Sequence, residues 1–147
     1  MKIVLDTNVL VAGLLSPFGA CGDIVRMISS GNLTLCIDAR ILSEYHEVLR
    51  RPKFQFEEDK IVTILDYVER NGQTIASSPL PTSLPDSDDE PFLEVALMGN
   101  VEYLITGNQV HFPSSLCQGV RVVSPADFLK LFLKQEKTEK MTERGDR

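Results

Sequence analysis

The stretch Lys-Ile-Val-Leu-Asp-Thr-Asn at residues 2–8 decides the fold class of this chain. Its three apolar residues predict a buried strand, and Asp6 stands where that strand ends, directly before an apolar helical stretch. Aspartate is a poor strand residue and is costly to bury without a partner. In an open α/β sheet, ligands bind beyond the carboxyl ends of the strands. Asp6 is therefore the first candidate for metal or phosphate chemistry.

Outward from this stretch, short apolar runs alternate with amphipathic segments, which predicts strands separated by helices. The strands are expected at residues 3–5, 33–37, 74–76, 103–106 and 120–123. The helices are expected at residues 9–15, 21–30, 39–51, 57–71, 89–98 and 125–133. This alternation predicts an α/β fold with a central parallel sheet covered by helices on both faces.

The chain has the length of one domain, which we place at residues 1–133. A loop rich in proline and serine occupies residues 77–87. From residue 134 onward, charges of both signs alternate with almost no apolar residues, which predicts a disordered tail over residues 134–147.

Composition narrows the functional classes. Apolar residues make up 43% and charged residues 24% of the chain, which is ordinary for a globular protein. A net charge of −6 argues against a protein that coats nucleic acid, but a nuclease with clustered carboxylates remains compatible with it. No apolar run is long enough for a membrane span, and the amino terminus lacks a secretory signal pattern. Three cysteines without metal-ligand spacing suggest reduced thiols, so we expect a cytoplasmic protein.

Glu44 is the second candidate acid, within the helix expected at residues 39–51. Helical spacing places it at the edge of the apolar face of that helix, whereas Glu47 points into water. An edge position lets a carboxylate reach a cleft beside the sheet, although a solvated glutamate on the helix flank fits the same spacing. The apolar face consists of Ile41, Leu42, Tyr45, Val48 and Leu49.

The third candidate acid comes from the cluster at residues 86–90. Acidic residues in the first turn of a helix often only complement its dipole or cap it, and Asp88 fits such a cap. Asp89 differs because it continues the apolar face of the following helix, so it points inward and needs a partner such as a cation. Glu94 is expected on the opposite, solvated face.

A further strand ends in Thr106, Gly107 and Asn108. Asn108 is either a turn residue or a fourth ligand beside the carboxylates. Packing or surface positions are expected for His46 and His111.

Four stretches, taken in this order, resemble the PIN-domain ribonucleases, and in particular the VapC-like toxin components of toxin–antitoxin pairs. These stretches are Asp-Thr-Asn-Val-Leu at 6–10, Leu-Ser-Glu-Tyr-His-Glu-Val-Leu-Arg-Arg-Pro at 42–52, Asp-Ser-Asp-Asp-Glu-Pro-Phe-Leu-Glu-Val-Ala at 86–96, and Tyr-Leu-Ile-Thr-Gly-Asn at 103–108 with His-Phe-Pro at 111–113. The resemblance covers residues 1 to about 133.

The resemblance implies a three-layer α/β/α PIN-like fold with the acidic site at the carboxyl ends of parallel strands. It implies Asp6, Glu44 and Asp89 as catalytic, metal-binding acids, with Asn108 where the family commonly has a fourth aspartate. The residues that orient these acids or water would be Thr7, Asn8, Asp88 and Thr106.

By this resemblance the protein is a metal-dependent endoribonuclease and the toxin of a toxin–antitoxin pair. Oxygen ligands imply Mg²⁺ or Mn²⁺ as the cofactor. RNA is the implied substrate, an antitoxin protein the implied partner, and a homodimer a further expectation. Candidates for steering the RNA backbone are Arg40, Arg50 and Arg51, although cations at the end of a helix fit a solvated surface equally well.

Two other interpretations remain open. Because Asn108 removes one negative charge, the chain could be a catalytically impaired PIN module that binds RNA or a partner protein. The haloacid-dehalogenase-like phosphatases also place an aspartate after the first strand. Their second aspartate, two positions further on, is Asn8 in this chain, which makes that match weak.

Overall fold

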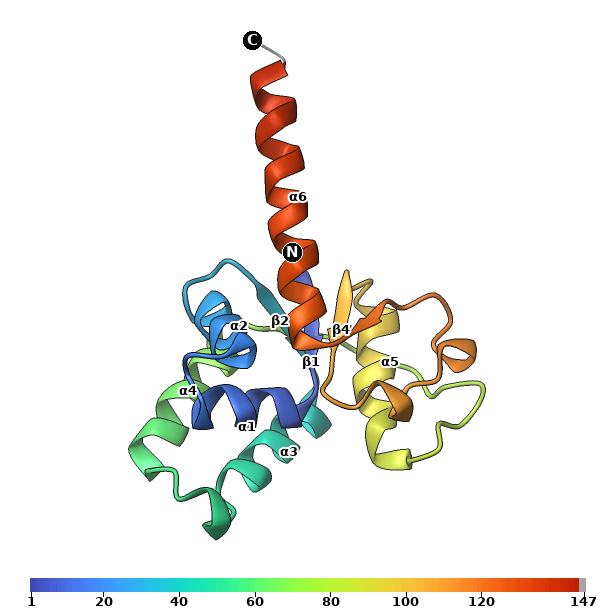
Figure 1. Cartoon of the computed structure of the whole chain (residues 1–147). Helices are drawn as coiled ribbons and strands as arrows, with labels where there is room; N and C mark the ends of the chain where they lie inside the picture. Colours follow the sequence, from blue (N-terminus) through green and yellow to red (C-terminus); the bar gives the residue numbers. More distant parts are fainter. Residues whose placement is uncertain (146–147) are drawn as a thin grey trace.

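Five short strands form one parallel sheet in residues 1–145, the part of the chain that the computed structural model describes. The strand order is β3-β2-β1-β4-β5, so the first strand lies at the centre (Figure 1). The strands are β1 (Lys2–Leu5), β2 (Thr34–Ile37), β3 (Gln73–Thr74), β4 (Tyr103–Ile105) and β5 (Val122–Val123). The predicted parallel α/β fold is confirmed.

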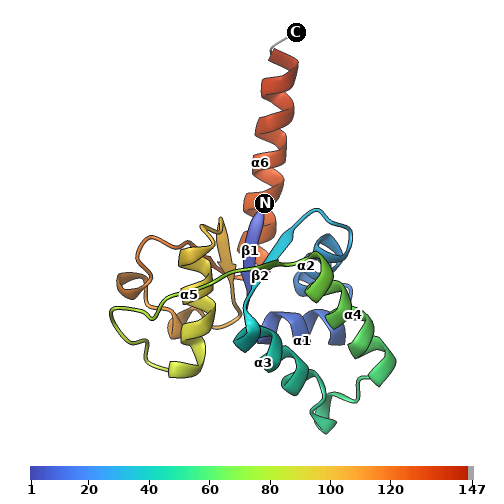
Figure 2. The same cartoon turned by 180° about the vertical axis from the view of Figure 1, so that it is seen from behind.

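Helices connect the strands and cover both faces of the sheet. In Figure 1 the last helix, α6, lies in front of β1 and β2, and in Figure 2, seen from behind, the strands lie in front of it. The helices are α1 (Thr7–Leu15), α2 (Ala20–Ser29), α3 (Ala39–Leu49), α4 (Glu58–Asn71), α5 (Glu90–Met98) and α6 (Pro125–Gly145). No single helix of the described residues is long and apolar enough to cross a membrane. Helices α1 and α2 meet the length and composition criteria only when they are counted together, and a bend of 100° separates them.

The central strand brings two distant polar residues to the same edge of the sheet. Ile3, Val4 and Leu5 are fully buried, as expected for a parallel strand covered on both faces. Leu5 is in register with Ile105 of β4. The residues that follow these two, Asp6 and Thr106, therefore emerge side by side at the carboxyl end of the sheet.

Helix α3 is fixed at its start and in its middle. Asp38 caps the helix by accepting a hydrogen bond from the backbone N–H of Ile41 at 3.0 Å. Further along, the hydroxyl of the buried Tyr45 donates to the backbone oxygen of Leu5 at 2.6 Å. The helix is thus held against β1, with its apolar face toward the core as predicted.

Helix α5 is covered on the side away from the sheet by residues 75–86, a segment that we call the strap. The strap crosses in front of the strands in Figure 2 on its way from β3 to α5. Two glutamates of α5 accept hydrogen bonds from the strap: Glu94 from the backbone N–H of Leu80 at 3.0 Å, and Glu90 from that of Leu84 at 2.9 Å. Glu94 is only 6% exposed, so its predicted position on a solvated face is wrong, because the strap covers that face.

Helix α6 is longer than the sequence predicts. We expected it to end at Leu133, but it continues to Gly145 and projects from the body of the molecule (Figure 1). The residues after Leu133 include many lysines and glutamates, which are strong helix formers and extend a helix that is already nucleated. The division into a domain at residues 1–133 and a tail at residues 134–147 stays a prediction, and residues 146–147 of that tail lie outside the described residues.

Candidate active site

Asp6 is the most deeply buried acid of the candidate site and lies at the carboxyl end of β1. It follows β1 as the residue that precedes the first turn of α1, and it is 7% exposed. One carboxylate oxygen accepts a hydrogen bond from the hydroxyl of Thr106 at 2.8 Å, and the backbone N–H of Asp6 donates to Ile105. Burial raises the pKa of Asp6 above its usual value, and the hydrogen bond from Thr106 opposes this shift.

Glu44 reaches the site from α3. The hydroxyl of Thr7, itself buried in the first turn of α1, donates a hydrogen bond to the Glu44 carboxylate. Burial raises the pKa of Glu44, the hydrogen bond from Thr7 lowers it, and the charge of Asp6 raises it again. Glu44 is half-buried whereas Glu47 is exposed, as the helical spacing predicted.

Asp89 lies at the start of α5, as the last residue of the short 3₁₀ helix η2 (Ser87–Asp89). Its Oδ2 atom is buried and has no hydrogen-bond partner among the described residues. Nδ1 of His111 lies 3.2 Å from this atom, without the geometry of a hydrogen bond. His111 belongs to the 3₁₀ helix η3 (Gln109–His111) after β4, so it approaches Asp89 from the neighbouring loop.

The three carboxylates lie close enough to repel one another. The pKa of Asp89 rises to about 6, first because of burial and next because of the charge of Asp6, with a smaller contribution from Glu44. His111 acts in the opposite direction and lowers this pKa. Because the charge of Asp6 raises the pKa of both Glu44 and Asp89, the site is unfavourable until positive charge enters it.

Thr106 links Asp6 to the loop after β4. Its fully buried hydroxyl donates to Asp6 and accepts a hydrogen bond from the backbone N–H of Asn108 at 3.0 Å. The side chain of Asn8 accepts a hydrogen bond from the backbone N–H of Gly107 at 3.3 Å. Asn108 is exposed, and its side chain makes no hydrogen bond with the residues that the structure describes.

Asp88 does not join the three acids. Its side chain is exposed, and its backbone N–H donates to the carboxylate of Asp86, which caps η2. Its charge still raises the pKa of Glu44. Asp89 rather than Asp88 is therefore the inward-facing acid of this segment, as the helical spacing predicted.

Carboxylate oxygens are the ligands that Mg²⁺ and Mn²⁺ prefer, and the buried Oδ2 of Asp89 is an acceptor without a donor. The site therefore has the donor chemistry for such an ion. In the described part of the chain, no three His, Cys, Asp or Glu side chains already stand in the arrangement of a metal-binding group.

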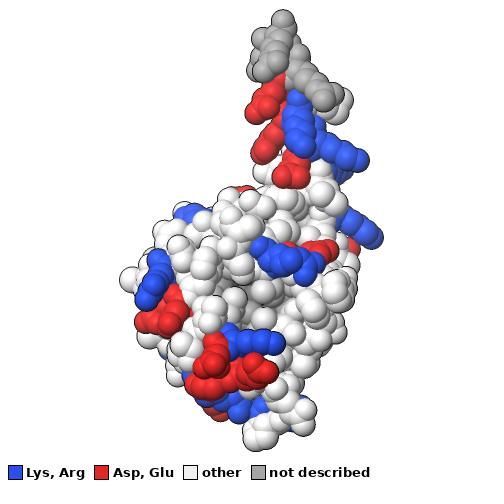
Figure 3. Space-filling view, turned by 90° about the vertical axis from the view of Figure 1, so that its left-hand side faces the viewer, with Lys and Arg blue, Asp and Glu red and all other residues white. Residues whose placement is uncertain are grey.

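The predicted RNA-steering arginines already have acidic partners. Arg40 forms ion pairs with Asp38 and Glu94, both at 2.7 Å. Arg50 pairs with Glu58 at 2.7 Å, and Arg51 lies 4.0 Å from Glu47. On the face where α2 and α4 lie, at the left of Figure 1, positive and negative groups also stand beside each other (Figure 3). The surface in this view is mixed in charge rather than broadly basic.

Sequence reasoning missed two residues near the acids. His111 was expected to pack or to lie on the surface, yet it faces Asp89. The His-Phe-Pro motif at residues 111–113 was the available signal, but nothing in the local pattern shows that this loop returns to α5. Glu94 was expected in water, and its burial depends on the strap, whose residue Leu80 donates to Glu94 from 14 positions away in the chain.

Comparison with known proteins supports the fold described above. The sequence model of a family described as PIN domain matches residues 2–110. The fold is also similar to that in the crystal structure of VapBC2 from Rickettsia felis bound to a DNA fragment from their promoter, with a TM-score of 0.58 and 17% sequence identity. That similarity covers 84% of this chain and 98% of the other. No curated protein matches the sequence.

Proposed function

Because the chain belongs to the PIN domain family, we propose that it is a metal-dependent endoribonuclease. The family match confirms the resemblance drawn from the sequence, and members of this family are generally nucleases. The observation that carries the proposal is the buried Oδ2 of Asp89, an acceptor without a hydrogen-bond partner among the described residues, beside Asp6 and Glu44. A carboxylate placed in this way is unfavourable for the fold alone and favourable for holding a cation.

Asp6, Glu44 and Asp89 would hold one Mg²⁺ or Mn²⁺. Mg²⁺ needs only one or two carboxylates in addition to waters and substrate phosphate, so three acids suffice for one ion. Asn108 would offer a neutral carbonyl oxygen at the position where the sequence predicts a fourth ligand. A second ion is less favoured, because this site has one negative charge fewer than a site with four acids.

When bound, such an ion lowers the pKa of a water molecule and stabilises the charge that develops on the attacked phosphate. The chain's own residues prepare this chemistry. Thr106 and Thr7 hold the carboxylates of Asp6 and Glu44 in fixed orientations through their hydroxyl groups. Burial limits the water around Asp6 and Asp89, which strengthens their attraction for a cation.

RNA would approach the acids from the carboxyl edge of the sheet. Arg50 and Arg51 are the candidates for contacting its phosphates, since both side chains are partly exposed at the end of α3 and their ion pairs lie at the surface. Arg40 is held between two carboxylates, so its predicted role in binding RNA has less support.

We further propose that the protein is the toxin of a toxin–antitoxin pair. The support is the similarity in fold to VapBC2, which was crystallised bound to a DNA fragment from the promoter of the pair. A small antitoxin protein would be the partner, and a homodimer is a second expectation. Expression of the chain alone should arrest growth, and co-expression of the antitoxin should relieve the arrest. Uninterrupted growth would contradict the toxin assignment.

A second candidate function is that of a PIN module that binds RNA without cleaving it. Asn108 favours this alternative, because its side chain is neutral and exposed at the rim of the acids. The two functions differ in their response to metal: only the nuclease gains activity when Mn²⁺ is added.

The test is RNA cleavage with Mn²⁺ by the wild-type protein and by two matched variants. Asp6→Asn removes a charge from the site, whereas Asp66→Asn makes the same change at an exposed position on α4. The proposal predicts cleavage by the wild type and by Asp66→Asn, and none by Asp6→Asn. Cleavage that survives Asp6→Asn would place the activity elsewhere, and RNA binding without cleavage would favour the second function.

A further inference from the structure

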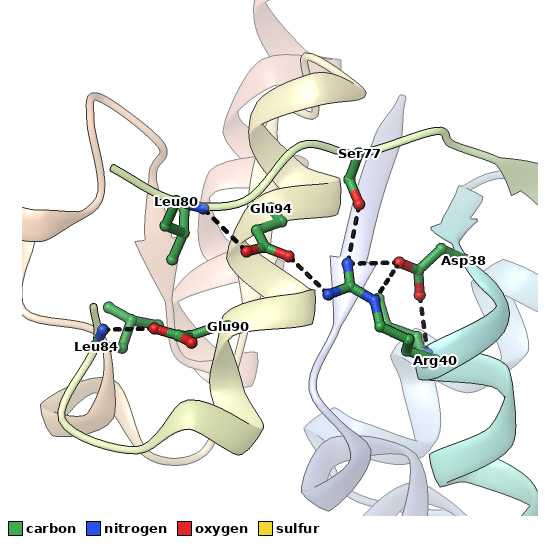
Figure 4. Close-up of polar contacts among 8 residues, drawn as sticks. Asp38, Arg40, Ser77, Leu80, Leu84, Glu90 and Glu94 are labelled. Atoms are coloured by element: carbon green, nitrogen blue, oxygen red, sulfur yellow. Dashed lines mark hydrogen bonds and ion pairs between the residues drawn. The ribbon is translucent and has the colours of Figure 1, made fainter. Parts of the chain in front are cut away.

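Arg40 joins three separate segments beside the acids. Its guanidinium donates to Asp38 at the start of α3, to Glu94 of α5, and to the hydroxyl of Ser77 in the strap, at 2.7–2.9 Å (Figure 4). Among the ion pairs of residues 1–145, only the one between Arg40 and Glu94 connects α3 with α5.

Glu94 is the deeply buried member of this connection. Its Oε1 atom accepts from Arg40 at 2.7 Å and its Oε2 atom accepts from the backbone N–H of Leu80 at 3.0 Å, so both oxygens have partners. Because only 6% of the residue is exposed, the Glu94 carboxylate relies on these donors in place of water. An interaction of this kind resists movement of α5 relative to α3.

The connection lies about one helical turn from Glu44 on α3 and about 1.4 turns from Asp89 at the start of α5. Arg40 precedes Glu44 by four residues on α3, and residues with this spacing lie on the same side of a helix. On the other helix, Glu94 follows Asp89 by five residues. The two helices therefore carry an attracting pair, Arg40 and Glu94, next to a repelling pair, Glu44 and Asp89.

We infer that Arg40 is a positioning residue: by holding Glu94, it keeps α3 and α5 at the separation at which Glu44 and Asp89 can share one divalent cation. This inference rests on the proposed function, since it concerns the same site. Without metal, repulsion between the acids favours separation of the two helices, and the Arg40–Glu94 pair counteracts it. The spacing of the two helices is thereby fixed before the ion arrives.

Electrostatics and positioning predict opposite effects of removing Arg40 on the affinity for a divalent cation. Removing the positive charge of Arg40 from the neighbourhood of the acids should strengthen their attraction for a cation. If Arg40 positions the acids, its removal should instead weaken metal binding, because Glu44 and Asp89 lose their common geometry. The direction of the change in Mn²⁺ affinity distinguishes the two effects.

The experiment is calorimetric titration with Mn²⁺ at a temperature well below unfolding for every variant. We expect Arg40→Met to raise the dissociation constant by about tenfold or more, the range typical for residues that orient metal ligands. The double variant Arg40→Met/Glu94→Gln should show the same loss; it leaves net charge unchanged, and the Gln carbonyl still accepts from Leu80. Arg40→Lys should restore part of the affinity.

Arg26→Met is the matched control, because Arg26 forms an exposed ion pair with Asp23 within α2 and touches none of the three acids. It should bind Mn²⁺ like the wild type. Tighter or unchanged binding by Arg40→Met, or unchanged binding by the double variant, would overturn the inference.

A second measurement tests the spacing without metal. Genetically encoded spin labels at two exposed positions, Glu47 on α3 and Met98 on α5, report the distance between these helices. The inference predicts one narrow distance distribution in the wild type and a broader or longer one in the double variant. Identical distributions would refute the inference.

Failure of the wild type to bind Mn²⁺ would instead refute the proposed metal site. The label distances would still decide whether Arg40 holds the two helices.

Discussion

Thr106 donates a hydrogen bond to Asp6 across one hundred positions of the sequence, with 2.8 Å between the hydroxyl and the carboxylate oxygen. Both residues directly follow strands that pair in register, so the sheet itself brings them together. The hydroxyl satisfies a buried carboxylate and fixes its direction at the same time.

Replacing Thr106 by valine should therefore destabilise the protein and weaken metal binding. Valine keeps the volume of threonine but leaves Asp6 without its donor, which should lower the free energy of unfolding by about 1–3 kcal/mol. Urea unfolding measures this loss, and calorimetry measures the affinity for Mn²⁺. Thr106→Ser keeps the hydroxyl and should retain metal affinity; equal affinity loss in both variants would show that the hydroxyl does not orient Asp6.

The affinity for Mn²⁺ should fall as the pH is lowered through about 6. Metal binding requires the charged carboxylate, and the pKa of Asp89 in the metal-free protein is about 6. Affinity should be nearly constant above pH 7 and should decrease by about tenfold per pH unit below 6, because one proton competes with the ion. Titrations between pH 5 and 8 check this dependence. An affinity that stays constant down to pH 5 would contradict the participation of Asp89.

Asp89→Asn should stabilise the metal-free protein at neutral pH. The pKa of Asp89 rises from 3.8 to about 6 on folding, so folding disfavours the charged form. This cost is present above pH 6 and disappears as the pH falls below 3.8. After allowance for solvent screening, the gain should be about 1 kcal/mol, or about 2–4 °C in Tm.

Thermal unfolding in EDTA measures this gain at pH 7.5 and again at pH 4. At pH 4 the wild type and Asp89→Asn should differ much less in Tm, because Asp89 is then largely protonated in the folded state. A wild type that is the more stable protein at pH 7.5 without metal would contradict the proposed repulsion.

Asn108→Asp should tighten Mn²⁺ binding. An added carboxylate beside the other three acids increases the attraction for a divalent cation, by about tenfold in affinity at a typical surface dielectric. Asn32→Asp is the matched control, since it adds the same charge at an exposed position before β2, at the opposite edge of the sheet. Equal effects of the two substitutions on calorimetric affinity would show that Asn108 does not border the metal site.

Most of the fold could be predicted because its signals are local. Buried parallel strands are continuous apolar runs, and the helix boundaries coincide with glycine, proline and capping residues such as Asp38. The inward direction of Glu44 and Asp89 likewise followed from helical spacing, although their roles remain proposals. Each of these features depends on a few neighbouring residues.

The side-chain positions that the sequence could not predict depend on contacts between distant segments. Helical spacing placed Glu94 in water, but the strap covers that face and Arg40 pairs with Glu94 from 54 positions away. In the same way, His111 faces Asp89 only because the loop after β4 folds back toward α5. Periodicity identifies the face of a helix but not what covers it.

The central claim is that Asp6, Glu44 and Asp89 hold a divalent cation, and calorimetric titration with Mn²⁺ tests it most directly. We predict that the wild type binds one Mn²⁺ per chain at pH 7.5 and that Asp6→Asn, with its fold intact by circular dichroism, does not bind. Binding that is absent from the wild type at millimolar Mn²⁺, or that persists in Asp6→Asn, would contradict this account.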